Sequence, residues 1–209
     1  MKKIIVICAM EKEFSLISGM EGQTGAELHV RLSGMGKVNA ALSAAEMISE
    51  FRPDMVINTG VAGSFAQGIR QGDTVIADRC AYHDVWCGEG NAPGQVQGLP
   101  TFFPCDSDLV RKTSGILPDA HVGTIITGDQ FYISREEDER QKRLFPDALA
   151  VDMESAAIAQ TCFLKNIPFL SIRVISDIHD GHQAESYAGF WESMARKSFV
   201  SIKSILGAI

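Results

Sequence analysis

The amino-acid sequence predicts an α/β fold: a single domain with a mainly parallel, twisted central sheet flanked by helices. Short runs rich in valine and isoleucine alternate along the chain with longer amphipathic stretches, an order typical of parallel sheets. Several of these runs are apolar at successive positions, which indicates strands buried on both faces. No linker divides the 209 residues, so one domain covering residues 1–209 is expected.

Each expected element follows from its local pattern. The expected strands are short and rich in β-branched residues, and they cover residues 2–8, 27–33, 54–59, 73–78, 120–126, 148–152 and 168–175. The expected helices have helix-forming or amphipathic sequences, and they cover residues 11–19, 37–51, 106–115, 134–144, 154–165 and 185–206. The stretch 38–48 is rich in alanine, which favours a helix packed closely on a sheet. Residues 88–95 are rich in glycine and are expected to form a loop within the domain.

Composition narrows the class of partner. The net charge is −7 and the 19 lysines and arginines are scattered, which argues against binding to nucleic acid. No apolar run approaches the roughly 20 residues that cross a bilayer. The five cysteines form no C-x-x-C pair, and Met1 leads straight into a short strand with no signal peptide, so a reduced, cytoplasmic protein is expected. The expected partner is a small molecule.

Three carboxylates each follow an expected strand: Glu13, Glu154 and Asp177. The carboxyl ends of strands in an open α/β sheet border the ligand crevice, so side chains far apart in sequence converge there. Carboxylates with a water molecule between them suit hydrolysis of a glycosidic bond. The alternative is that all three stabilise the first turns of helices, which is the simpler interpretation for any one of them alone.

Two glycine-containing segments follow expected strands. Residues 33–37 (SGMGK) precede a helix, as anion or ribose sites often do, but they do not form a Walker loop. Residues 58–64 (NTGVAGS) are small enough for backbone N–H groups near Ala62 and Gly63 to contact a substrate. Tight strand-to-helix turns use glycine with or without a ligand, so the structural alternative is equally good for each.

A third segment, residues 127–133 (TGDQFYI), places Phe131 and Tyr132 just beyond an expected strand. An aromatic face there could stack on a heterocyclic base, an interaction of roughly 1–3 kcal/mol. The alternative is that Phe131 covers the core.

The combination of these segments is more specific than any one of them. Several short runs occur along the chain in the same order as in one protein family. They are 9–13 (AMEKE), 33–37 (SGMGK), 58–63 (NTGVAG), 82–84 (YHD), 94–96 (GQV), 128–131 (GDQF), 151–157 (VDMESAA) and 173–177 (RVISD). The chain resembles the 5'-methylthioadenosine/S-adenosylhomocysteine nucleosidases of the purine nucleoside phosphorylase-like superfamily over nearly its whole length. This resemblance implies a nucleoside phosphorylase-like fold.

The resemblance also implies roles in a reaction. Asp177 is similar to the acid that protonates N7 of adenine, and Ser176 to the residue that orients it. Glu13 is similar to the base that activates the attacking water. Met153 and Glu154 match the residues that hold the ribose, with the carboxylate on the 2'- and 3'-hydroxyls.

Further positions match substrate contacts. Phe131 resembles the aromatic that stacks on adenine, and the backbone of Tyr132 the one that contacts the edge of the base. Met10 and Met35 match apolar neighbours of the ribose and the 5'-substituent. Tyr187 stands where the family has an aromatic over the 5'-thio group. The resemblance further implies a homodimer in which a neighbour's loop completes the 5'-pocket.

The chemistry requires these residue types. Adenine leaves readily only if N7 receives a proton, so Asp177 must stay protonated, and a desolvated site near other acids raises a carboxyl pKa in that direction. Glu13 must be ionised to take a proton from water, and ionised Glu154 would stabilise the oxocarbenium-like sugar. No metal or other cofactor is needed. His179 and His182 have a spacing that could suggest a metal site but is usual in solvated loops.

The chain departs from the family pattern at Asp152, usually Glu, and at Val61, often Ser, so hydrogen bonds near the ribose are expected to be rearranged. Arg173 matches an arginine near the catalytic centre with a structural or orienting role. The loop 85–93 differs most, which leaves the choice among 5'-methylthioadenosine, S-adenosylhomocysteine, 5'-deoxyadenosine and aminodeoxyfutalosine open.

Two rival functions share the fold. A nucleoside phosphorylase would need arginines at the glycine-containing segments to bind phosphate, and these segments have none. A protein that only binds nucleosides would not need Glu13, Glu154 and Asp177 together. Hydrolysis is therefore favoured.

Overall fold

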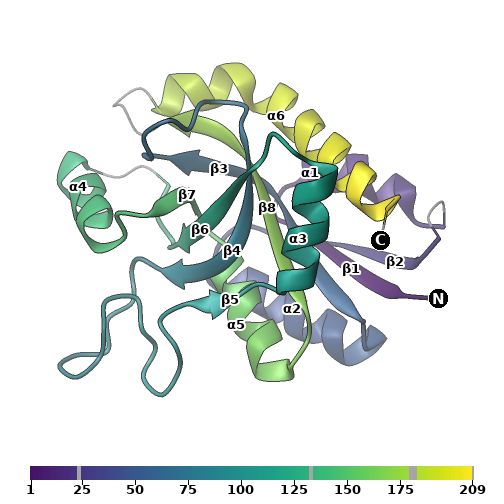
Figure 1. Ribbon diagram of the computed structural model, residues 1–209, viewed down its shortest axis with the longest axis horizontal. Coiled ribbons are helices and arrows are strands. Elements are labelled where there is room, and N and C mark those ends of the chain that lie inside the picture. The colour runs from purple at the N-terminus through teal and green to yellow at the C-terminus, as the bar shows by residue number, and fades with distance from the viewer. Residues whose placement is uncertain (23–24, 132–133, 179–182, 209) are drawn as a thin grey trace.

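The computed structural model describes residues 1–22, 25–131, 134–178 and 183–208, and for residues 183–192 it describes the backbone alone. A mixed eight-stranded sheet lies between helices on its two sides (Figure 1). The strands are β1 (Lys3–Cys8), β2 (Glu27–Leu32), β3 (Met55–Ser64), β4 (Thr74–Tyr82), β5 (Phe103–Pro104), β6 (His121–Thr127), β7 (Ala148–Asp152) and β8 (Phe169–Ile178). The helices are α1 (Glu11–Ile17), a 3-10 turn (Ser18–Met20), α2 (Lys37–Phe51), α3 (Ser107–Ile116), α4 (Arg135–Leu144), α5 (Ser155–Lys165) and α6 (Gln183–Leu206).

The sheet closes on itself over part of its width. Strands β2, β1 and β3 are parallel neighbours, and β8 pairs with β3 in the same direction. Strand β8 is antiparallel to β4, which is followed by parallel β6 and β7, and β7 returns antiparallel to β3 at Gly63 and Val151. We call β3, β8, β4, β6 and β7 the strand ring.

The prediction of a mainly parallel sheet is therefore confirmed only in part. Neighbouring strands reverse direction twice around the ring, between β8 and β4 and between β7 and β3. The short β5, which also runs antiparallel to β4, was not predicted because two residues carry no periodic pattern. Among the described residues, no helix has the length and apolar character to span a bilayer.

The core has a layer on each side of the sheet, as the continuous apolar strands predict. On β1, Ile5 and Ile7 pack in the cluster that contains α2 and α5 residues, whereas Ile4 and Val6 pack in the cluster that contains residues of α1, α3 and α6. All four are completely buried. Alternation along a strand thus sends successive residues to opposite layers.

Strands β3, β4 and β8 extend further than their apolar runs predict. The strand expected over residues 54–59 was predicted to end at residue 59, but residues 60–64 continue β3 alongside β8 as far as the Ser64–Ile178 pair. Polar and small residues end a hydrophobic pattern without ending a strand when a neighbouring strand still binds their backbone groups. The extension places Val61, Ala62 and Gly63 along the wall of a pocket.

Candidate active site

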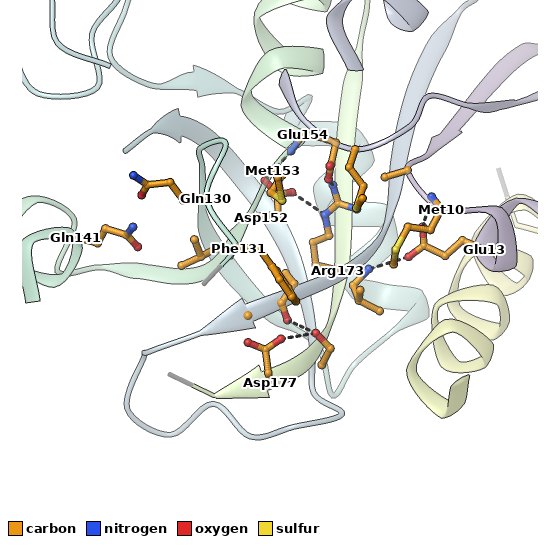
Figure 2. A pocket seen from close by; sticks show the side chains of 17 residues that line it. Met10, Glu13, Gln130, Phe131, Gln141, Asp152, Met153, Glu154, Arg173 and Asp177 are labelled. Carbon is orange, nitrogen blue, oxygen red and sulfur yellow. Dashed lines mark hydrogen bonds and ion pairs between the residues drawn. The ribbon is translucent and has the colours of Figure 1, made fainter. Parts of the chain in front are cut away.

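A pocket opens where β3, β7 and β8 meet the first turn of α1 (Figure 2). Seventeen residues line it: Ala9, Met10, Glu13, Met35, Val61, Ala62, Gly63, Gln130, Phe131, Gln141, Val151, Asp152, Met153, Glu154, Arg173, Ser176 and Asp177. The three carboxylates that follow strands in the sequence are all among them, and each is almost completely buried.

Glu13 is held by two backbone groups at the start of α1. Its Oε2 accepts a hydrogen bond from the Met10 N–H at 3.2 Å, and its Oε1 accepts one from the Val61 N–H at 3.1 Å. The first contact caps the helix, so the capping interpretation holds for Glu13 alongside its place in the pocket. Burial raises the pKa of Glu13, although the Arg173 guanidinium and these N–H groups oppose the shift.

Glu154 occupies the N-cap position of α5, yet its carboxylate does not cap that helix. Oε1 instead accepts the Gly36 N–H at 3.0 Å, and Oε2 lies 3.4 Å from a terminal nitrogen of Arg173. Burial raises the pKa of Glu154 to about 7 despite the opposing charge of Arg173, and the charge of Asp152 adds to the rise. The carboxylate can therefore change its charge near neutral pH.

Arg173 lies fully buried between these acids. Its Nε donates to Asp152 Oδ2 at 2.7 Å, and its Nη2 donates to Asn58 Oδ1 at 2.6 Å and faces Glu154. A Cβ at Gly60 would lie 2.5 Å from Arg173 Nη1 and 2.9 Å from Glu13 Oε1. Glycine is required at position 60 because the guanidinium and the Glu13 carboxylate both approach the β3 backbone.

Asp152, the last residue of β7, anchors the guanidinium. Oδ1 accepts from the Thr127 hydroxyl at 2.5 Å, the Ser155 hydroxyl donates to Oδ2, and the backbone N–H groups of Glu154 and Ser155 also point at this carboxylate. Because these groups fix Asp152, they fix the direction of Arg173 as well.

Asp177 lies near the end of β8, on another wall of the pocket from Glu13 (Figure 2). The Ser176 hydroxyl lies 2.6 Å from Asp177 Oδ1 and 3.2 Å from the Ala62 carbonyl oxygen. This hydroxyl links the acid to β3 and limits its rotation.

Apolar side chains complete the pocket. Phe131 is 43% exposed and lines the pocket, and its ring stands between the groups of labelled polar residues in Figure 2. Met10, Met35 and Met153 also line the cavity. An aromatic ring with flexible thioethers around it suits a flat base and a sulfur-containing substituent.

Comparison with known proteins agrees with this geometry. Residues 3–206 match the Phosphorylase superfamily. A curated 5'-methylthioadenosine/S-adenosylhomocysteine nucleosidase of Staphylococcus aureus (strain MRSA252) is 38% identical over 188 residues, which cover 88% of this chain and 82% of the relative. The chain belongs to this nucleosidase family.

Solved structures of the nucleosidase family have the same fold. The Neisseria meningitidis nucleosidase in complex with methylthio-immucillin-A superposes with a TM-score of 0.94 at 36% identity, covering 100% of both chains. The Colwellia psychrerythraea nucleosidase in complex with adenine has a TM-score of 0.93 at 31% identity, covering 99% of this chain and 95% of that one.

In this member of the nucleosidase family, the pocket gathers nearly all residues that the sequence predicts for it. Tyr132 and the side chain of Tyr187 lie outside the described residues, as do His179 and His182. His83 is buried and contacts Gln141, and it does not line the pocket. The predicted site residues other than Tyr132 and Tyr187 all line the pocket.

Gln141 and Asn58 are among the contributors to the site that the sequence analysis did not single out. Gln141 belongs to a highly charged helix, α4, in which a single glutamine gives no signal. Asn58 was recognised only as part of a glycine-containing segment, although its side chain binds both Arg173 and the Ile7 carbonyl oxygen. An amide in the middle of an apolar strand was the available signal, because a buried amide needs partners.

Proposed function

We propose that this protein hydrolyses the N-glycosidic bond of 5'-methylthioadenosine and S-adenosylhomocysteine, releasing adenine and the 5-thioribose product. The observation that carries the proposal is the convergence of Glu13, Glu154 and Asp177 in one apolar pocket beside an aromatic face. The family membership and the adenine and methylthio-immucillin-A complexes of relatives support it.

The proposed acid is Asp177, which donates a proton to N7 of adenine while the C1'–N9 bond breaks. Its support is its burial beside the Ser176 hydroxyl, which holds the carboxyl in one orientation. A proton on N7 turns the departing adenine from an anion into a neutral base.

The proposed base is Glu13, which takes a proton from the attacking water. The raised pKa supports this role, because a base whose pKa lies closer to the working pH transfers protons more effectively. Two backbone N–H groups keep its oxygens in place during the transfer.

Glu154 is proposed to accept hydrogen bonds from the ribose hydroxyls, with Met153 beside it. Phe131 is proposed to stack on adenine, and Met10 and Met35 to contact the ribose and the 5'-substituent. The proposed contacts of Tyr132 and Tyr187 rest on the resemblance alone.

Water is the proposed nucleophile, because the site has no place for phosphate among its described residues. The N–H groups at the start of α2, which would otherwise suit an anion, already bind protein carboxylates: Gly36 binds Glu154 and Lys37 binds Asp129. Arg173, the one arginine of the pocket lining, is bound to Asp152 and Asn58. Glu13 would in addition repel a phosphate dianion.

The test is adenine release from 5'-methylthioadenosine in phosphate-free buffer, followed by chromatography. We expect release without phosphate in the wild type. Release that requires phosphate would establish a phosphorylase, and the absence of release in both buffers would favour a protein that only binds nucleosides. Rates on S-adenosylhomocysteine, 5'-deoxyadenosine and aminodeoxyfutalosine would define the preference at the 5' position.

Two substitutions test the assigned roles. Asp177→Asn removes the proton donor and Glu13→Gln removes the base, and each is expected to lower kcat by about 10²–10⁴-fold. Circular dichroism would confirm that both variants fold, and Asp119→Asn, at an exposed position, serves as the matched control. Turnover at the wild-type rate by Asp177→Asn would remove Asp177 from the mechanism.

We also propose a homodimer whose interface includes one face of α2. Val38 is 77% exposed and Leu42 is 58% exposed, and they lie one turn apart on this helix. Exposed Met35 precedes them and also lines the pocket, while Trp86 is 70% exposed on the loop after β4. A partner covering this face would reach the 5' end of the pocket.

A cytoplasmic location is proposed on the state of the cysteines. All five are free thiols, four of them buried, as is usual in a reducing compartment.

A further inference from the structure

Lys37, the first residue of α2, joins three parts of the chain that are distant in the sequence. Its Nζ donates a hydrogen bond of 2.6 Å to Asp84 Oδ2, two residues beyond the end of β4. Its backbone N–H donates a hydrogen bond of 2.8 Å to Asp129 Oδ1, in the segment that follows β6. The Asp129 N–H in turn donates to Asp84 Oδ2 at 3.0 Å. We call Lys37, Asp84 and Asp129 the lysine clamp.

The lysine clamp is more enclosed than an ordinary surface ion pair. The side chains of Lys37 and Asp84 are 22% and 16% exposed, so solvent and salt screen their attraction less. A Cβ at Gly128 would overlap the His83 ring and would lie 3.0 Å from Asp84 Cγ. The segment after β6 therefore lies directly against Asp84, where the hydrogen bond from Asp129 holds it.

The start of α2 and the segment after β6 also approach each other directly. A Cβ at Gly36, where φ is +91°, would lie 3.0 Å from Asp129 Oδ1. The Lys37 ammonium lies 2.6 Å from an oxygen of Asp84 and 3.8 Å from one of Asp129. Without this positive charge, two carboxylates would face each other at the contact and repel.

Each end of the lysine clamp leads to a residue of the pocket lining. Gly36 precedes Lys37, and its N–H holds Glu154 Oε1 at 3.0 Å. Phe131 follows Asp129 by two residues. Both Glu154 and Phe131 line the pocket (Figure 2). The clamp thus connects the backbone that holds the carboxylate to the segment that carries the aromatic ring.

We propose that Lys37 is a positioning residue: through the lysine clamp it fixes the distance between Glu154 and Phe131. This inference rests on the proposed function, in which the first of these groups holds the ribose and the second stacks on the base. A nucleoside contacts both groups at once, so a change in their spacing misaligns its C1'–N9 bond. Free adenine contacts the ring alone and can follow it when the segment moves.

The test compares these two ligands in Lys37→Met, which keeps the length of the side chain and removes its charge. We expect kcat/KM for 5'-methylthioadenosine to fall by about 10–100-fold, while the Kd of adenine in calorimetry changes by less than about threefold. A general structural role would weaken both ligands alike. Equal losses for the nucleoside and the base, or no loss for either, would overturn the proposal.

Arg31→Met is the matched control. Arg31 forms an exposed ion pair of 2.9 Å with Glu46 of the same helix, so this change also removes one positive charge and one ion pair from α2. It should leave kcat/KM and the Kd of adenine unchanged. An equal fall of kcat/KM in Arg31→Met and Lys37→Met would assign the effect to the lost charge and contradict the positioning role.

A double substitution tests the route through Asp84. Asp84→Ala removes the acceptor that Lys37 and Asp129 share, and by itself it should cause the same selective loss of nucleoside cleavage. Because Lys37 is proposed to act through this acceptor, Lys37→Met should lower kcat/KM by no more than about threefold in an Asp84→Ala background. A further loss as large as in the wild-type background would show that the lysine acts by another route.

The outcomes are separable from those of the proposed reaction. If the wild type releases no adenine, the reaction is wrong, and the Kd of 5'-methylthioadenosine replaces kcat/KM in the comparison. A larger loss for the nucleoside than for adenine in Lys37→Met then supports the positioning role, and equal losses overturn it. If the wild type releases adenine and Lys37→Met matches it, the reaction stands and the positioning role is wrong.

Discussion

Glu154 changes its charge near neutral pH, because burial raises its pKa to about 7. Its pKa of about 7 belongs to the ligand-free protein, and kcat/KM reports the ionisation of the free enzyme. If the ionised carboxylate holds the ribose, kcat/KM should rise with pH and level off above about 7. The measurement is kcat/KM for 5'-methylthioadenosine between pH 5 and 9.

The matched variants for this prediction are Glu154→Gln, which should lose the rise near pH 7, and Glu50→Gln, an exposed change that should retain it. A rise that persists unchanged in Glu154→Gln would assign the ionisation to another group, with Glu13 the first candidate.

The close approach of Arg173 and Glu13 to Gly60 predicts that a larger residue at this position lowers both stability and activity. In Gly60→Ala the new methyl group would overlap Arg173 and Glu13, so both must move. We expect a loss of stability of about 1–3 kcal/mol and a large loss of kcat, measured by urea unfolding and adenine release. Gly115→Ala, in α3 with open space around it, should instead stabilise the protein by about 0.5–1 kcal/mol and leave kcat unchanged. Equal behaviour of the two variants would contradict the close approach at position 60.

At the residue scale, the sequence identified the acids and not their environment. The positions of Glu13, Glu154 and Asp177 just after apolar strands identified them as candidate site residues, because acidic side chains are costly where a buried sheet ends. The four-way contact of Arg173 with Asp152, Asn58, Glu154 and Ser155 joins segments more than 100 residues apart, and local patterns carry no information about it.

At the scale of elements, the junction between β7 and α5 controls the charge of the site. Asp152→Asn keeps the shape of the side chain and removes one negative charge beside Glu154. Since the charge of Asp152 raises the pKa of Glu154, the rise of kcat/KM should move to lower pH in this variant. The pH profile tests this directly.

The same variant should lose roughly 3 kcal/mol of stability, because Arg173 loses a buried partner. Asp147→Asn, exposed just before β7, is its control and should shift neither the profile nor the stability. A profile that moves to higher pH in Asp152→Asn would reverse the proposed direction of coupling.

Element boundaries were predicted well where the local signals agree. The alanine-rich helix 37–51 was predicted with its observed bounds, since composition and the preceding glycines agree there. The ends of β3, β4 and β8 were predicted too early, because residues such as Gly60, Gly63 and Ser176 resemble loop residues. They stay in strands because β3 and β8 bind one another.

At the scale of the whole molecule, the exposed face of α2 predicts that a substitution on this face dissociates the proposed homodimer. Leu42→Glu should convert a dimer to a monomer in analytical ultracentrifugation and weaken activity by exposing the 5' end of the pocket. Glu50→Gln, on the same helix, should leave the dimer intact. A wild type that sediments as a monomer at micromolar concentration would exclude the proposed assembly.

The fold class could be predicted from the sequence, but the closure of the sheet into the strand ring could not. Alternating strands and helices specify layers, and continuous apolar strands specify burial on both faces. The strand ring depends on the pairing of β7 with β3 and of β8 with β4, and those partners are distant in the sequence.

The strand ring leaves few places where another chain could add a strand. Within the described sheet, only β2 and the two-residue β5 pair on one side alone. Strand β2 carries Glu27, His29 and Arg31 at alternate positions, and charged edges resist edge-to-edge aggregation. The closure that shapes the pocket thereby also protects the folded protein from misassembly through its sheet.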